Sequence, residues 1–297
     1  MTMLSAMRRF TCLSILLAAA AFLTACGTGS RLGDARPMKN VRLYVGPTGA
    51  AGPTGWKGPP VGPTGATGPT GCYGPRTWVA VNRGPWRFLA CGDAPSASPD
   101  GRYVAYVDEG TEYVIPAAGG KPTTIGYGHW GPTWAPNSRL LAYLGDSPNL
   151  VVVDVQTGKQ QVSTPAAYDT ALAFSPDSQR IAYTRGGARQ LCCHRDLFVV
   201  PTSGGAPVRI TDDHRVYGYF SLAWGAPGIA FPQTAHAGTE IWLTDGRKHD
   251  GRRLTHGGDI PWAAQLYFSA NGRELRAARG ARVWAIDLSS GDVRKLR

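Results

Sequence analysis

Aromatic, histidine and carboxylate side chains recur in the polar stretches between the apolar segments of this chain. His129 precedes Trp130, and Asp212 and His214 flank a further aspartate. Such side chains bind ligands when loops bring them to one face of a fold, and single residues among them can instead cap strand ends. The candidate binding residues are Tyr127, His129, Trp130, Tyr168, Asp212, His214, Tyr217 and Trp262.

No catalytic motif accompanies these residues. The chain has no G-x-S-x-G elbow, no H-E-x-x-H pair and no phosphate-binding glycine loop. Cys192, Cys193 and His194 are adjacent and lack the spacing of metal ligands. We therefore expect no catalytic residue, no metal and no cofactor. The alternative is a small-ligand or metal-dependent activity that uses Asp212 and His214.

The cysteines indicate an exported protein with disulfide bonds. Besides Cys12 in the amino-terminal leader and Cys26 directly after it, the chain has an even number, Cys72, Cys91, Cys192 and Cys193. Two disulfides are expected in an oxidising compartment, and their connectivity is open. A Cys72–Cys91 bridge would join the linker described below to the first strands of the domain.

The amino terminus has the composition of a secretory signal. Arg8 and Arg9 precede an apolar run, 13–23, that is too short to span a bilayer. The sequence Leu-Thr-Ala-Cys ending at Cys26 resembles the lipobox of bacterial lipoproteins. The resemblance implies a signal peptide over 1–25, acylation of Cys26, and attachment to the outer membrane, facing the periplasm, if the cell has two membranes. A plain signal peptide with an incidental cysteine is the alternative.

Residues 26–75 form a basic linker rich in Gly-Pro-Thr. Glycine occupies every third position from Gly46 to Gly58, and again from Gly62 to Gly74 after the extra residue Val61. This period is typical of collagen, but it is short and interrupted, which favours an extended spacer and a monomer over a trimer.

The net charge of +11 is concentrated near this linker. Residues 26–91 have eight basic side chains and one acidic, whereas 92–297 have 21 basic and 19 acidic. The distribution favours a tether beside anionic lipid over a nucleic-acid partner, and a merely solvated linker is the alternative.

A repeated segment organises residues 95–297. The segment 171–184 reads ALAFSPDSQRIAYT, and weaker copies occupy 95–107, 132–144, 221–231 and 266–278. Each copy has two short apolar segments around a turn, and equivalent positions are 37, 40, 50 and 44 residues apart. Short strands with a period of this length are typical of a β-propeller.

Each copy is followed by a strand, a glycine turn and an edge strand, which completes a four-stranded blade. These second halves are 112–125, 149–162, 196–211, 240–255 and 282–296. A further half-blade, 76–89, predicts a sixth blade that takes a strand from VRLYV, 41–45. Five blades with an amino-terminal hairpin are the alternative. The candidate binding residues fall at one end of the blades, and the S-P-D-G and G-G turns fall at the other.

The repeat resembles that of the TolB-like, WD-repeat-related propellers of bacterial envelopes. The match rests on Ser175-Pro176-Asp177, Ile181-Ala182-Tyr183 and Gly204-Gly205-x-Pro207, while the copy at 221–231 lacks the acidic turn residue. The resemblance implies an all-β propeller over 76–297 and a non-catalytic scaffold. We expect a lipid-anchored protein that binds an envelope protein or peptide.

Overall fold

The computed structural model describes residues 41–46, 76–81, 87–145, 149–166, 170–186, 195–217, 221–235, 238–248, 251–256, 258–260 and 264–296. The predicted leader, Cys26 and nearly all of the predicted linker lie outside these ranges. The described residues form strands, turns and loops, and none of them is in a helix.

The first sheet has three described strands. They are β1 (Val41–Gly46), β2 (Arg76–Val81) and β3 (Arg87–Cys91), in the order β1-β2-β3. β1 pairs with β2 along its whole length, from Val41 opposite Val81 to Gly46 opposite Arg76. The apolar segment VRLYV is therefore a strand of this sheet, as the sequence predicts.

The second sheet has seven antiparallel strands. They are β4 (Asp93–Ala97), β5 (Tyr103–Asp108), β6 (Thr111–Pro116), β7 (Thr123–Trp134), β8 (Leu140–Gly145), β9 (Asn149–Asp154) and β10 (Gln160–Pro165). β7 pairs with β6 through 123–127 and with β8 through 128–134, so it ends one four-stranded unit and begins the next. Residues 126–131, which separate the second half 112–125 from the repeat copy at 132–144, are part of this strand, and its glycines allow it to bend between the two units.

Three four-stranded sheets follow, each in chain order. They are β11 (Leu172–Phe174), β12 (Arg180–Arg185), β13 (Asp196–Pro201) and β14 (Val208–Arg209); β15 (Ala223–Gly225), β16 (Gly228–Ala235), β17 (Gly238–Thr244) and β18 (Arg252–Arg253); and β19 (Gln265–Phe268), β20 (Glu274–Arg279), β21 (Arg282–Asp287) and β22 (Val293–Lys295).

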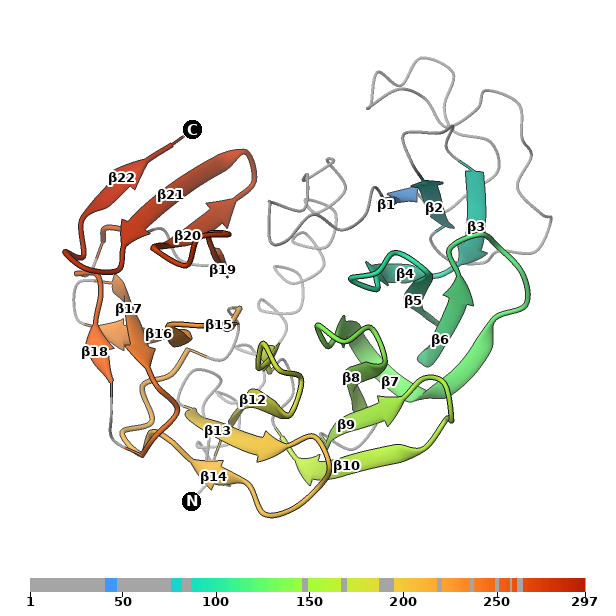
Figure 1. The fold of residues 1–297 in the computed structure, drawn as a ribbon, viewed down its shortest axis with the longest axis horizontal. Coiled ribbons are helices and arrows are strands. Elements are labelled where there is room, and N and C mark those ends of the chain that lie inside the picture. Colours follow the sequence, from blue (N-terminus) through green and yellow to red (C-terminus); the bar gives the residue numbers. More distant parts are fainter. Residues whose placement is uncertain are drawn as a thin grey trace, which may run out of the picture.

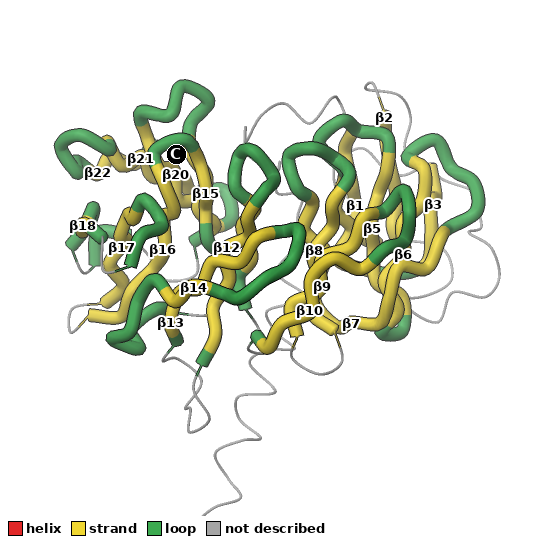
Figure 2. The backbone as a smooth tube through the Cα atoms, turned by 60° about the horizontal axis from the view of Figure 1, so that its bottom comes forward, coloured by secondary structure: helices red, strands yellow, loops and turns green. Residues whose placement is uncertain are grey.

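The sheets are arranged radially. β1, β4, β15 and β19 lie toward the centre of the molecule, and β3, β14, β18 and β22 lie at its periphery (Figure 1). Figure 2 shows the strands running between two layers of loops and turns. Among the described strands, β1–β3 and β19–β22 form separate sheets, so no sheet combines the two ends of the chain. The number of blades stays a prediction.

The hydrophobic core lies between neighbouring sheets. Side chains of a strand alternate between its two faces, so Ile181 and Tyr183 pack with Leu150 of the preceding unit, whereas Ala182 packs in a different cluster. Ala182 belongs to the cluster of Ile229 in the following sheet. Both faces of each inner sheet are covered, which explains why these strands are almost uniformly apolar.

The turns between the first two strands of each unit have a structural role. Ser175 Oγ donates to Asp177 and accepts the Arg180 N–H at 2.9 Å, and Ser98 and Ser269 make equivalent bonds. Neighbouring turns are also linked, because the Asn137 N–H donates to Ser178 Oγ at 3.0 Å. The polar groups of these turns are therefore used in bonds within and between blades.

Candidate binding face

The opposite end contains the connections between sheets and the turns between the two middle strands of each unit. We call this end the loop face and define it by the described residues 108–111, 126–131, 211–217 and 258–260. These segments share one end because all paired strands are antiparallel.

The structure describes some of the predicted binding residues. Tyr127 is 65% exposed at the bend of β7, where an aromatic side chain has little to pack against. His129 and Trp130 belong to the same strand. Asp212, His214 and Tyr217 lie together in the connection from β14 to β15, whereas Tyr168 and Trp262 lie outside the described residues.

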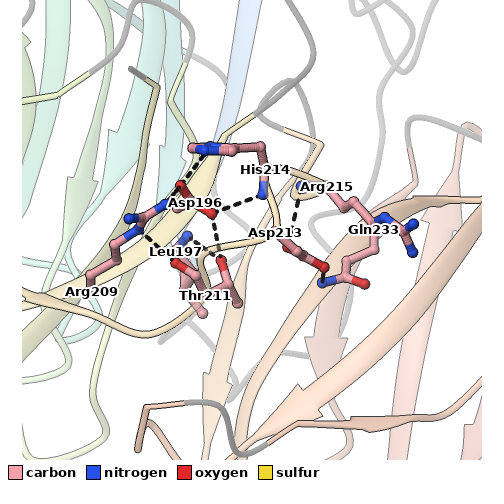
Figure 3. A network of polar contacts seen from close by, with 8 residues as sticks. All are labelled: Asp196, Leu197, Arg209, Thr211, Asp213, His214, Arg215 and Gln233. Atoms are coloured by element: carbon pink, nitrogen blue, oxygen red, sulfur yellow. Dashed lines mark hydrogen bonds and ion pairs between the residues drawn. The ribbon is translucent and has the colours of Figure 1, made fainter.

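A buried carboxylate fixes this connection (Figure 3). Asp196, at the start of β13, is 2% exposed. Its Oδ2 lies 2.6 Å from the Arg209 guanidinium and 2.9 Å from His214 Nδ1. Its Oδ1 accepts the His214 backbone N–H at 3.1 Å and the Thr211 hydroxyl at 3.3 Å. A paired and hydrogen-bonded carboxylate is the form in which a buried charge is tolerated.

The same connection is joined to the next sheet. Val216 forms isolated bridges with Arg195 and Gln233, and Gln233 Nε2 donates to Asp213 Oδ2 at 3.3 Å. His214 and Asp213 therefore connect two blades. The Asp-Asp-His segment was a candidate for binding or catalysis. We conclude that two of its residues, Asp213 and His214, have a structural role.

A second group of carboxylates lies where β4, β5 and β6 reach the loop face. We call this group the acidic site and define it as Asp93, Asp108, Glu109 and Glu112. Asp93 is opposite Val107, and Val107 is opposite Glu112, so Asp93 and Glu112 are on the same side of the sheet. Asp108 and Glu109 are at the turn between β5 and β6.

Glu112 is the most buried member of the acidic site. It is 0% exposed, and neither of its carboxyl oxygens has a hydrogen-bond partner among the residues that the structure describes. Burial, with a contribution from Asp93, raises the pKa of Glu112 to about 8. Partial burial and the Asp108 carboxylate raise the pKa of Asp93. Burial and Glu109 raise the pKa of Asp108. The like charges are thus coupled across the site.

Two glycines of β7 make room for this arrangement. A Cβ at Gly126 would lie 1.8 Å from the Tyr143 hydroxyl, and one at Gly128 would lie 2.4 Å from the Leu144 carbonyl oxygen and 3.2 Å from Glu112 Oε1. Burial and the Glu112 carboxyl raise the pKa of Tyr143. A residue with a side chain at position 126 would therefore clash with Tyr143, and one at position 128 would clash with Leu144 and crowd Glu112.

Asp93 and Glu112 were not among the residues predicted from the sequence to bind. The signal was present for Glu112, because it alternates with the buried Val114 and so belongs to the inward face of β6. Asp93 had no such signal, because its position depends on a register shift between Asp93 and Ser96 in the pairing with β5.

The remaining predictions concern cysteines, metals and membrane segments. Cys91 is disulfide-bonded, and Cys26, Cys72, Cys192 and Cys193 lie outside the described residues. Over the described part of the chain, no three His, Cys, Asp or Glu side chains converge as metal ligands. Within the same residues, no helix has the length and apolar character needed to cross a bilayer.

Several solved structures resemble this chain. The β-propeller domain of the Trilobed protease from Pyrococcus furiosus, described as having an open velcro topology, matches with a TM-score of 0.55 and 12% identity, over 74% of each chain. The fold is a β-propeller. Oligogalacturonate lyase from Vibrio parahaemolyticus matches with a TM-score of 0.53 and 12% identity, over 75% of this chain and 71% of that one.

TolB from Acinetobacter baumannii is also similar to this propeller. The TM-score is 0.49 and the identity 16%, over 86% of this chain and 68% of TolB. Neither a protein-family model nor a curated protein matches the sequence. The predicted all-β propeller is confirmed, and its neighbours include a TolB protein, a protease domain and a lyase.

Proposed function

We propose that this propeller is a binding module whose loop face recognises a protein or peptide of the cell envelope. An amino-terminal lipid on Cys26 would hold it at the membrane, with residues 26–75 as a spacer and the protein as a monomer. The proposed anchor rests on the lipobox resemblance, and the monomer on the interrupted glycine period.

The observation that carries the proposal is the contrast between the two ends of the propeller. The turn end uses its polar groups internally, as in the Ser175–Asp177 and Asn137–Ser178 bonds. The loop face also uses polar groups internally, at Asp213 and His214, but it presents the exposed Tyr127 and the carboxylates Asp108 and Glu109, which have no basic partner among the described residues. Tyrosine is among the residues enriched at interaction surfaces and at their energetic centres, and surface charge steers a partner of opposite charge.

Capture from envelope extracts tests the proposal. The purified full chain is immobilised, and the Tyr127→Ala variant is compared with Val208→Ala, which removes a side chain that is 54% exposed on the edge strand β14. We expect Tyr127→Ala to reduce the yield of the captured protein at least fivefold and Val208→Ala to leave it unchanged. Equal loss in both variants would indicate nonspecific adhesion and would contradict the proposal.

A second candidate function is an activity on a small ligand. Similar propellers occur in a protease and in an oligogalacturonate lyase. In this reading Asp212 and His214 act on the ligand, so His214→Ala or a chelator should abolish the activity while partner capture persists. The structural bonds of His214 favour the first function.

A further inference from the structure

The acidic site differs from the other carboxylates of the propeller. Elsewhere in the described chain the buried carboxylates Asp154 and Asp196 lie beside Arg139 and Arg209, at 2.5 and 2.6 Å. Asp93, Asp108, Glu109 and Glu112 have no such cation within the residues that the structure describes. The described residues therefore do not neutralise the negative charge of this part of the loop face.

Glu112 belongs to this site, and its carboxyl group lacks hydrogen bonds to the described residues. Its side chain is beside Val107 and on the same side of the sheet as Asp93, and its pKa responds to Asp93. A carboxyl group that is fully buried without one hydrogen bond costs folding free energy and calls for an explanation. Gly126 and Gly128 preserve the space in which it sits.

One exposed carboxylate, Asp93, shares the face of the sheet on which Glu112 is buried. Asp93 is exposed and Glu112 is buried on one face of the sheet, whereas Asp108 lies on the other face with Tyr106, and Glu109 is exposed at the turn. A cation held between Asp93 and Glu112 would lie in surroundings with little water, where Coulomb attraction is stronger.

The positions of these carboxylates favour a guanidinium or ammonium group over a divalent metal ion. A divalent metal ion requires several oxygen ligands that converge on one point, and no three acidic or histidine side chains of the described chain do so. A guanidinium or ammonium group instead needs separate acceptors, because its donors point in several directions. Carboxylates on either side of Val107 offer that pattern.

We propose that the acidic site binds the positively charged side chain of an arginine or lysine on the partner polypeptide. The inference rests on the proposed function, because it names the chemistry that the loop face recognises. The bound cation would supply the hydrogen bonds that Glu112 lacks and would neutralise its neighbours.

Binding of this kind is coupled to a proton. Glu112 is mostly protonated at neutral pH, and a cation binds its ionised form, so affinity should rise as the pH approaches and passes about 8. The titratable groups of the described residues that interact with Glu112 are Asp93 on β4 and Tyr143 on β8, and neither is cationic. From pH 7 to pH 9 the affinity should tighten about tenfold.

The test uses two matched probes with the purified full chain. The peptides acetyl-Ser-Arg-Ser-amide and acetyl-Ser-citrulline-Ser-amide differ only in charge at one side chain. Binding is followed through the methyl signals of Val107, which lies between Asp93 and Glu112, at pH 7, 8 and 9. We expect saturable binding of the arginine peptide, at least tenfold weaker binding of the citrulline peptide, and the stated pH dependence.

Three variants assign the effect. Glu112→Gln keeps the shape of the protonated acid and should weaken arginine binding and remove its pH dependence. Asp93→Asn, at an exposed position, should weaken binding at least threefold and keeps the test valid if Glu112→Gln folds poorly. Asp100→Asn is the control, because it removes an acid from the turn end of the same sheet, where Asn137 and Asn271 occupy equivalent positions.

Equal binding of both peptides, or no binding of either, would overturn the inference. So would tight Ca²⁺ binding that Glu112→Gln abolishes, which would indicate a metal site. If partner capture depends on Tyr127 while both peptides bind equally, only this inference fails and the proposed function stands.

Discussion

The Asp196 carboxylate and the His214 imidazole lie 2.9 Å apart, between the start of β13 and the connection that leads to the next sheet. Arg209 contacts the same carboxylate oxygen, at 2.6 Å. One buried acid thus holds a strand, its edge strand and a loop of the loop face in a fixed relation.

Removal of this acid should destabilise the propeller. Asp196→Ala leaves the Arg209 and His214 side chains and the His214 N–H without their shared acceptor, which costs about 3 kcal/mol of unfolding free energy. Urea unfolding measures the change. As a control, Asp245→Asn alters an exposed pair with Arg247 and should change the free energy by less than about 0.5 kcal/mol. Equal midpoints for the two variants would show that the Asp196 network adds nothing.

The pH dependence of stability should report Glu112. Its pKa is raised to about 8 in the folded chain, so the folded state holds the proton more tightly than the unfolded state. Its contribution to stability is fully present below the unfolded pKa near 4.5 and is lost as the pH rises through about 8.

Glu112→Gln should therefore be more stable than the native chain at pH 9, by several kcal/mol at most, and the difference should shrink toward pH 5. Urea midpoints of both proteins across this range test the sign. A native chain that gains stability relative to Glu112→Gln as the pH rises is incompatible with a buried, unpaired Glu112.

The link between neighbouring turns should be measurable at Ser178. This residue has a φ of 62°, and its hydroxyl accepts the Asn137 N–H from the preceding blade. Ser178→Ala loses the bond and keeps the strained backbone, at a cost of about 1–2 kcal/mol. Ser178→Gly loses the same bond but suits a positive φ, so it should cost less. Ser203→Ala, at an exposed turn position, is the control, and an alanine effect no larger than this control would refute the role.

Cys91 should be joined to Cys72. Arg76 is opposite Cys91 in the pairing of β2 with β3, and Cys72 precedes Arg76 by four residues. Four residues span at most about 14 Å, so the chain length allows a bridge between Cys72 and Cys91. Cys192 and Cys193 belong to the segment between β12 and β13, in a different sheet. Peptide mapping without reduction should find the Cys72–Cys91 pair, and a peptide that joins Cys91 to another cysteine would correct the assignment.

The sequence predicted the sheets better than the site, for a physical reason. Strand pairs such as Phe174 opposite Ile181 follow from local apolar segments and from the turn chemistry of Ser175 and Asp177. The partners of His214 could not be predicted, because Asp196 and Arg209 come from separate strands. The closeness of Asp93 and Glu112 could not be predicted either, because it depends on how β4 pairs with β5 and β5 with β6.

The most direct test of the binding proposal places a photo-crosslinking side chain, p-benzoylphenylalanine, on each end of the propeller in living cells. Tyr127 marks the loop face, and the exposed Ala118, in the turn between β6 and β7, marks the opposite end. We expect irradiation to join one envelope protein to the chain substituted at Tyr127 and not to the chain substituted at Ala118. Adducts from Ala118 alone, the same adducts from both positions, or none from either would contradict a partner-binding loop face.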